Sequence, residues 1–311
     1  MKTIDLHQDL MTHIRFRDVF GQSEQTSFEL IAGSDLDTVI VTAFPMPPGD
    51  DQHHHTVSVL ITEELQMYHD FVESQKQWSI VKKGADLDVG GKKLLLHIEG
   101  LNVFDGTQKS WNDLEKWHEL GVRSIGTHWN LENALGGGTL QPEIGLTTLG
   151  AEVVEYIERK NMALDMAHMG RKTFWDVANL TTRPLYVSHG NADAVCSNVR
   201  NYTDEQLYKI AESGGVVGVF FPNTFVTGKE VSGCVEDVIA HIVYIKNLIG
   251  VEHIAIGSDF GGIVTGTVEG LASVADVSSL WTSMQTCGFN ESELEAVAYN
   301  NAYRILQAHL E

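Results

Sequence analysis

Histidine and acidic side chains stand where the predicted strands of this sequence end, and such side chains bind metal ions. His7 and Asp9 come at the end of the first apolar run, in the stretch DLHQD. They are two positions apart, so on an extended backbone both side chains project to one side and could hold one ion. A single histidine at a strand end is weak support, because most histidines only form hydrogen bonds. The prediction therefore depends on further residues of the same kind.

Later strands end in residues of the same kind. They are Glu99 in HIEG, His128 in GTHW, His168 in DMAH, His189 in VSHG and Asp259 in GSDF. Together with His7 and Asp9 this makes seven groups, more than the three protein ligands and one water that a single catalytic zinc ion takes. The surplus indicates a two-metal site with residues left for chemistry. Glu99 lies between the first pair and the later histidines in strand order, so we expect it to bridge the two ions.

The elements that must position these residues alternate along the chain. Short β-rich runs occupy residues 3–6, 38–43, 94–98, 122–127, 163–166, 185–188, 216–220 and 254–256. Segments with apolar residues at helical spacing occupy residues 57–75, 148–159, 204–212, 235–248 and 291–308. This alternation predicts an α/β fold, a (β/α)8 TIM barrel forming one domain over residues 1–311, with the active site at the C-terminal ends of the strands. The alternative is an open doubly wound sheet, whose reversal of strand order a sequence cannot display.

Composition excludes several classes of protein. The chain has 311 residues, 43% of them hydrophobic and 20% charged, as in ordinary globular proteins. A net charge of -21 argues against nucleic acid and anionic membranes as partners. We find no signal peptide and no apolar run of the roughly 20 residues that span a bilayer, so we expect a cytoplasmic protein. Three widely spaced cysteines argue against a disulfide framework.

Five motifs, in order along nearly the whole chain, resemble those of the membrane dipeptidase (renal dipeptidase) family of the metal-dependent amidohydrolase superfamily. They are DLHQD at residues 5–9, HIEG at 97–100, DMAH at 165–168, the run from SHGNA at 188–192 to VRN at 199–201, and IGSDF at 256–260. Five motifs in the family's order are far more specific than any one of them. The resemblance implies a metal-dependent hydrolase.

The resemblance also implies two Zn²⁺ ions and a ligand set. His7, Asp9 and Glu99 would hold the first ion, while Glu99, His168 and His189 would hold the second. Glu99 is then the bridging ligand, as its place in the strand order already suggested. Imidazole and carboxylate ligands suit other divalent metals as well, so the sequence leaves the identity of the ion open.

By the same resemblance three residues serve catalysis and substrate binding. His128 matches the histidine that faces the substrate carbonyl, Arg200 the arginine that binds substrate, and Asp259 the aspartate that carries protons. Family members cleave dipeptides, often accepting a D-residue at the C-terminal position, and a homodimer is implied. A hydroxide that bridges the two metal ions is the expected nucleophile.

One residue departs from the family pattern. The family commonly has Asp-Phe-Asp-Gly after the last strand, whereas this chain has Gly261 after Asp259 and Phe260. An acidic side chain is therefore missing beside the proposed proton carrier.

Other readings stay open. Asp5, His97 and Asp165 are either supports for the metal ligands or plain core residues. The protein could be another binuclear amidohydrolase that acts on a cyclic amide or lactone, or a catalytically silent barrel that binds metal without turnover. A sugar-phosphate isomerase barrel ranks last, since no phosphate-binding glycine loop follows the last two strands.

Overall fold

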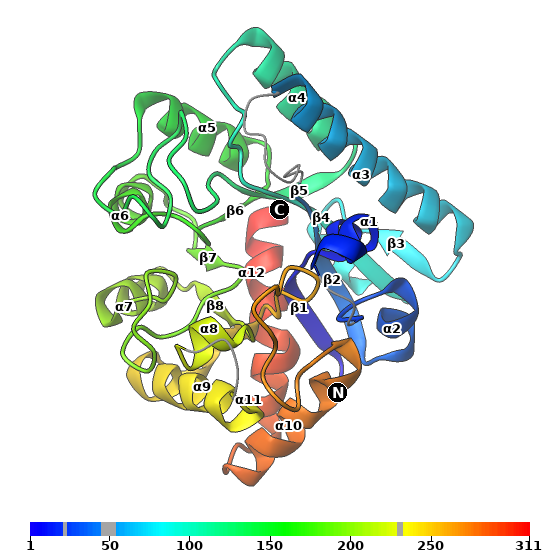
Figure 1. Ribbon diagram of the computed structural model, residues 1–311, viewed down its shortest axis with the longest axis vertical. Helices are drawn as coiled ribbons and strands as arrows, with labels where there is room; N and C mark the ends of the chain where they lie inside the picture. The colour runs from blue at the N-terminus through cyan, green and yellow to red at the C-terminus, as the bar shows by residue number, and fades with distance from the viewer. Residues whose placement is uncertain (21–23, 45–53, 229–232) are drawn as a thin grey trace. The chain divides into compact units, whose positions relative to one another are not determined.

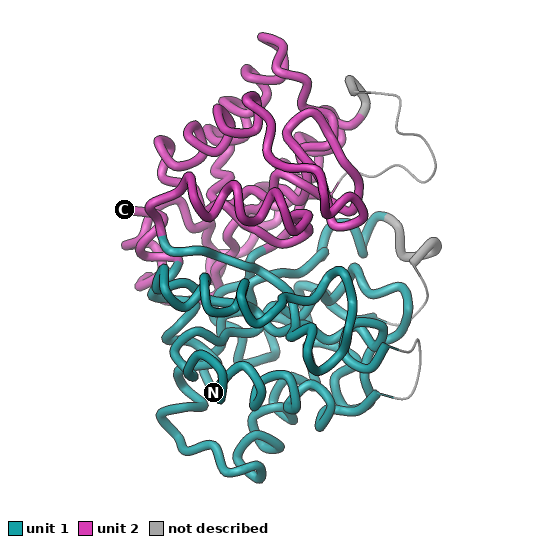
Figure 2. The backbone as a smooth tube through the Cα atoms, turned by 90° about the vertical axis from the view of Figure 1, so that its left-hand side faces the viewer, with its two compact units in different colours: residues 1–40, 184–305 teal, residues 41–183, 306–311 magenta. Residues whose placement is uncertain are grey.

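The computed structural model of the protein describes residues 1–20, 24–44, 54–228 and 233–311 (Figure 1). Its chain divides into two compact units, coloured separately in Figure 2. The first unit comprises Met1–Ile40 and Pro184–Ile305, and the second comprises Val41–Arg183 and Leu306–Glu311. The expectation of a single domain over residues 1–311 stays a prediction.

A parallel sheet forms the centre of the first unit. Its strands, in spatial order, are β1 (Thr3–Gln8), β9 (Ile254–Ile256), β8 (Val216–Val219) and β7 (Tyr186–Val187). Every residue of these strands is buried, as parallel strands covered on both faces should be. Gln8, the last residue of β1, forms one more parallel bridge with Phe260, which follows β9. This pairing therefore continues into the segments that carry His7, Asp9 and Asp259.

Helices of the first unit follow or precede these strands. They are α1 (Leu10–Phe20), α2 (Phe28–Gly33), α7 (Asp204–Glu212), α8 (Asn223–Val226), α9 (Val235–Ile249), α10 (Val277–Thr286), α11 (Glu291–Glu295) and the first part of α12 (Asn301–Leu310), with short 3-10 turns at Val251–His253 and Val274–Asp276. Local sequence sets their starts. In α7, for example, the Thr203 hydroxyl accepts a hydrogen bond from the backbone N–H of Gln206, and the Gln206 side chain accepts one from the backbone N–H of Thr203.

Parallel strands also form the centre of the second unit. Its strands, in spatial order, are β6 (Ala163–Asp165), β5 (Val122–Gly126), β4 (Lys92–Glu99) and β3 (Trp78–Ile80). Strand β2 (Leu36–Ala43) contributes residues to both units. The register between β4 and β5 shifts after Leu96, which pairs with Val122, because the next pair is His97 with Ser124. Irregularities of this kind re-aim side chains beside functional sites, and Glu99 lies just beyond this one.

Four longer helices belong to the second unit. They are α3 (His54–Ser74), α4 (Gln108–Glu119), α5 (Thr148–Arg159) and α6 (Arg171–Leu180), with a 3-10 turn at Gly84–Asp88. Thr107 and Thr147 cap α4 and α5 by accepting a backbone hydrogen bond in the first turn. The buried face of α5 includes Val153, Val154 and Ile157, whose spacing is helical.

All eight predicted strands are present, with ends that differ by a few residues. Strand β3 was not predicted, and neither were α1, α2, α4, α6, α8 and α10. The predicted helix over residues 291–308 is a single run that contains a π-helical segment at Ala296–Asn300. Within the described ranges, no helix combines the length and the apolar character needed to cross a bilayer.

Gly218 on β8 allows a close approach that another residue would prevent. A Cβ atom at this position would overlap the carbonyl oxygen of Ser188, at the end of β7. We expect Gly218→Ala to lower the free energy of unfolding by about 1–3 kcal/mol, as overpacked core substitutions do. Gly33→Ala is the matched control, because a Cβ there would meet nothing within 4 Å. Urea denaturation of both variants measures the difference, and equal effects at the two positions would contradict this account.

Candidate functional site

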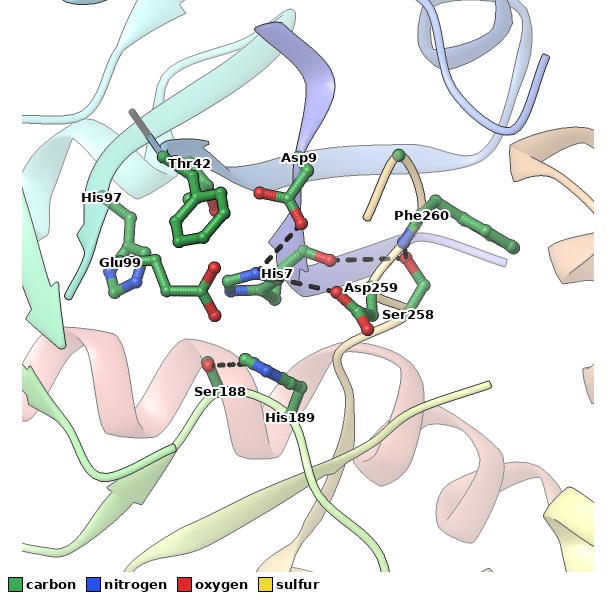
Figure 3. A network of polar contacts seen from close by, with 12 residues as sticks. His7, Asp9, Thr42, His97, Glu99, Ser188, His189, Ser258, Asp259 and Phe260 are labelled. Carbon is green, nitrogen blue, oxygen red and sulfur yellow. Dashed lines mark hydrogen bonds and ion pairs between the residues drawn. The ribbon is translucent and has the colours of Figure 1, made fainter. Parts of the chain in front are cut away.

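The first unit brings three of the predicted site residues together. His7 lies near the C-terminal end of β1, Asp9 comes directly after this strand, and Asp259 lies in the segment that follows β9 (Figure 3). His7 Nε2 lies 3.6 Å from Asp9 Oδ2 and 3.9 Å from Asp259 Oδ1. Ligand atoms of all three residues lie within 4.8 Å of one another, which is the spacing expected around a bound cation.

His189 lies beside His7 in the same unit. The two imidazole rings are 4.1 Å apart between centroids. Ser188 Oγ is 2.8 Å from His189 Nδ1 and so fixes the orientation of that ring (Figure 3). Phe220 contacts the same ring at a centroid distance of 5.6 Å. His189 is therefore held in one orientation by a polar contact and an apolar one.

In the second unit, Glu99 and His168 form a pair. His168 Nε2 lies 3.0 Å from Glu99 Oε1, and both side chains are buried. His168 Nδ1 contacts Asn130 Oδ1 at 2.9 Å, and the His168 carbonyl accepts a 2.9 Å hydrogen bond from Thr139. If the imidazole donates to Asn130 from Nδ1, then Nε2 carries the lone pair that a metal ligand needs.

His97 and Asp165 make a second buried pair in this unit. His97 Nε2 is 3.7 Å from Asp165 Oδ2, and His97 Nδ1 is 2.8 Å from Ser124 Oγ. Asp165 also accepts a hydrogen bond from the backbone of Ala167. His97 is two residues before Glu99 on β4, so the pair supports the strand that carries Glu99.

His128 is fully buried at the end of β5. Thr127 Oγ1 is 2.8 Å from its Nδ1. Its Nε2 lies beside Gly136, with no hydrogen-bond partner of good geometry in the part of the chain that is described. Burial lowers the pKa of His128 from 6.5 to about 4, and the Gly136 backbone opposes this only in part. His128 is therefore neutral at physiological pH.

Asp259 differs from an ordinary carboxylate in conformation and in proton affinity. Its φ is +65°, in the left-handed region that residues other than glycine seldom adopt. Burial and the neighbouring Asp9 raise the pKa of Asp259 to about 7, and His7 and Arg200 oppose this rise only in part. A carboxyl group with such a pKa can both accept and release a proton near neutral pH.

Arg200 lies against two aromatic rings. Its guanidinium is 5.6 Å from the ring centroid of Phe220 and 6.0 Å from that of Phe225, and these rings stack on each other. The residue is 6% exposed. Asn201, its neighbour, donates hydrogen bonds to the carbonyls of Cys196 and Phe225. The loop that carries Arg200 is thus tied to the turn that carries Phe225.

Gly261 stands where the resemblance of the motifs implies an acidic residue, and the backbone conformation at this position favours glycine. Its φ is +95°, and a Cβ would lie 2.6 Å from the Asp9 carbonyl oxygen. The turn after Asp259 is therefore one that an aspartate would strain. Gln25 instead contacts this turn, since its Oε1 accepts a hydrogen bond from the Gly261 backbone at 2.9 Å.

The donors fit a divalent metal ion. Asp9 Oδ1 is buried with no hydrogen-bond partner among the described residues. A buried carboxylate oxygen in that state is costly unless a cation compensates it. In the second unit, the 3.0 Å approach of His168 Nε2 to Glu99 Oε1 joins two groups that commonly share a metal ion.

Sequence reasoning missed three residues that support the site. Asn130 contacts His168, Ser258 contacts Asp5, and Gln25 contacts Gly261. Ser258 stands next to Asp259 in the sequence, and this position could have marked it as a residue that supports the site. Asn130 and Gln25 lie outside the predicted strands and helices, in stretches with no distinguishing motif, and only the fold brings them to their partners.

Comparison with known proteins decides the family. The family model described as membrane dipeptidase (peptidase family M19) matches residues 1–310. The chain belongs to this family. An uncharacterised protein of Klebsiella pneumoniae from the pqqA 5' region is 36% identical over 69% of this chain and 81% of its own length. Dipeptidase aclJ of Aspergillus oryzae is 32% identical over 68% of this chain, and that match spans half of the fungal protein.

Solved structures of this family show the same fold. A dipeptidase described as a family M19 metallopeptidase superposes with a TM-score of 0.89 over 100% of this chain and 99% of its own, at 23% identity. A metallopeptidase of Rhodobacter sphaeroides gives a TM-score of 0.88 over 99% of both chains, at 22% identity. This likeness confirms the predicted (β/α)8 barrel and rejects the open sheet. As a member of the membrane dipeptidase family, the protein is a metallo-dipeptidase by class.

Burial of neutral His128 makes folding depend on pH. The unfolded chain binds a proton at this residue below about 6.5, whereas the folded chain does so only near 4, so between these values the unfolded state holds more protons. The free energy of unfolding that depends on neutral His128 is therefore at its full value above pH 6.5, and it is lost as the pH falls toward 4. We expect metal-free wild type to lose about 2 kcal/mol more than His128→Gln between pH 7 and pH 5.

Chemical denaturation of both chelated proteins at the two pH values measures this difference. The same loss of stability in wild type and variant would show that His128 is not buried in its neutral form.

Proposed function

We propose that the protein is a zinc-dependent dipeptidase that hydrolyses dipeptides, including those with a D-amino acid at the C-terminal position, by attack of a metal-activated water. The cluster of His7, Asp9 and Asp259 carries this proposal, in a chain whose length the family model matches almost completely. The relative of Rhodobacter sphaeroides was crystallised with a phosphinate mimic of the dipeptide L-Ala-D-Ala. That ligand supports the D-residue as a candidate substrate feature here.

We assign the metal ligands as the motifs suggest. His7, Asp9 and Glu99 would hold one ion, and Glu99, His168 and His189 would hold the other. Support comes from the buried Asp9 oxygen and from the contact of His168 with Glu99. Nitrogen and carboxylate donors of this kind suit zinc. When bound, the ions acidify a water molecule toward a pKa of about 7 and polarise the scissile carbonyl.

Proton transfer falls to Asp259. It would take a proton from the attacking water and deliver it to the departing amine, acting as general base and then as general acid. A pKa of about 7 suits both steps, because neither protonation state is strongly favoured near neutral pH.

His128 would stabilise the oxyanion that forms during attack. A neutral imidazole whose Nδ1 accepts the Thr127 hydroxyl carries its proton on Nε2, where it is a hydrogen-bond donor. Such a donor is typically worth ~10²-fold or more in rate.

Arg200 would bind the free C-terminal carboxylate of the substrate. A guanidinium forms two parallel hydrogen bonds with a carboxylate, and Phe220 and Phe225 hold its plane. A site that requires the free C-terminal carboxylate of the substrate close to the scissile bond would accept only very short peptides.

The proposal is tested first by metal analysis combined with a dipeptide assay. We expect near two zinc ions per purified chain and release of free amino acids from L-Ala-D-Ala and several L,L-dipeptides. Chelation should abolish the activity, and added Zn²⁺ should restore it. Metal without cleavage of any dipeptide would contradict the proposal and favour another amide substrate or a silent barrel. A panel of cyclic amides then separates those two readings.

Asp259→Asn tests the proton carrier. We expect kcat to fall ~10²- to 10⁴-fold, the range of general acid–base contributions, while metal content stays near that of wild type. Asp276→Asn is the control, because the carboxylate of Asp276 accepts hydrogen bonds from the backbone of Ala272 and from the backbone and hydroxyl of Ser273, and so serves only to cap a short turn. An Asp259→Asn variant that retains wild-type kcat would rule out this role.

A further inference from the structure

Asp259 needs structural support of its own. Within the described residues, the non-glycine residues with positive φ are Asn161, His168 and Asp259. A side-chain-bearing residue keeps this conformation only where the surrounding structure enforces it. The contacts on either side of Asp259 show what enforces it.

On the N-terminal side, Ser258 is held by Asp5. The Asp5 carboxylate accepts hydrogen bonds from the Ser258 backbone at 2.8 Å and from Ser258 Oγ at 2.6 Å. Ser258 Oγ in turn accepts a hydrogen bond from the Phe260 backbone N–H at 3.2 Å (Figure 3). The Ser258 side chain thus links the two residues that flank Asp259 in the sequence. The Asp259 N–H itself donates to the His7 carbonyl at 3.1 Å. Asp5 and Ser258 are completely buried.

On the C-terminal side, Gln25 holds the turn. Its Oε1 accepts from the Gly261 backbone at 2.9 Å, and its Nε2 donates to the Ile263 carbonyl at 2.8 Å. Only 5% of Gln25 is exposed. Both ends of its amide are therefore used on the two residues that flank Gly262.

Two further side chains join these supports into a ring. Gln8 Nε2 donates to Asp5 Oδ2 at 2.7 Å, and Thr26, the neighbour of Gln25, donates to Gln8 Oε1 at 2.7 Å. We call Asp5, Gln8, Gln25, Thr26 and Ser258 the Asp259 support ring. Each member has its side chain satisfied by another member or by the backbone, and all of them are buried.

We propose that the Asp259 support ring positions the Asp259 carboxylate for proton transfer, with Asp5 and Gln25 as its two anchors. The inference rests on the proposed function. Asp5 acts on Asp259 through Ser258 and also accepts the backbone N–H of His7, while Gln25 acts through Gly261, so neither side chain needs to touch substrate or metal. Proton transfer requires its partners within a few tenths of an ångström of the productive distance, and a displacement of 1 Å can cost ~10²-fold in rate.

A purely structural role would have different consequences. Loss of loop stability alone would lower the melting temperature and leave kcat unchanged in the folded, metal-loaded enzyme. Loss of positioning would lower kcat while KM stays near its wild-type value, because Arg200 and the metal ligands remain in place.

The test uses Ser258→Ala and Gln25→Leu in the zinc-loaded protein. We expect kcat for a dipeptide to fall ~10- to 100-fold in each variant, with KM within about threefold of wild type and unchanged zinc content. Ser213→Ala is the matched control, because Ser213 Oγ also accepts one backbone N–H, from Leu185, and donates one hydrogen bond, to the Ile210 carbonyl. The control should lose stability and keep its kcat.

A double-variant series completes the test. In an Asp259→Asn background, Ser258→Ala and Gln25→Leu should cause no further loss of the residual kcat, because the group that they position is gone. A full additional loss in that background, or wild-type kcat in both single variants, overturns the positioning role while the dipeptidase function stands. A wild-type protein that cleaves no dipeptide overturns both. If one variant does not fold, the other still decides the outcome.

Discussion

Desolvation of ionisable side chains is the constraint on which this protein depends. The five proposed metal ligands are each at most 8% exposed, and removing charged groups from water costs several kcal/mol per ion in real proteins. Such groups persist in an interior only when they are paired, hydrogen-bonded or bound to a cation. Here every ligand has a defined neighbour of opposite or complementary character, such as Glu99 for His168 or His7 for Asp9. The polar residues around them serve to satisfy atoms that a metal ion does not contact.

Support of the site is therefore distributed over side chains that do no chemistry. Ser188 orients His189, Asn130 orients His168, and the Asp259 support ring surrounds Asp259. Two of the proposed functional residues, His168 and Asp259, lie in the left-handed region of φ. The strained backbone at these two residues indicates that the direction of their side chains matters more than the usual backbone preference of a non-glycine residue.

Much of the fold was predictable because parallel strands bury both faces and so stand out as apolar runs. Strand β3 escaped prediction because Trp78–Ile80 is only partly buried and contains Ser79, so it does not stand out as an apolar run. Helix α4 has a strongly polar composition, so its apolar positions are sparse in the sequence. The strand-end rule placed His7 and Glu99 at the ends of their strands and Asp259 after the last strand, and the structure has them near the ends of β1 and β4 and in the segment after β9. Contacts between loops far apart in the chain, such as that of Gln25 with Gly261, could not be predicted from the spacing of residues.

The turn at Gly261 also limits the routes by which this sequence can change. Its positive φ and the closeness of the Asp9 carbonyl mean that an acidic side chain cannot be introduced there while the present turn is kept. Gln25 fills the hydrogen-bonding role at the same turn. An acidic residue at position 261 would therefore require a different turn, and a different turn would disturb the hydrogen bond to Gln25, which lies 236 residues away in the sequence. The glycine at position 261 and the contact with Gln25 thus depend on the same turn, although the two residues lie in loops far apart in the sequence.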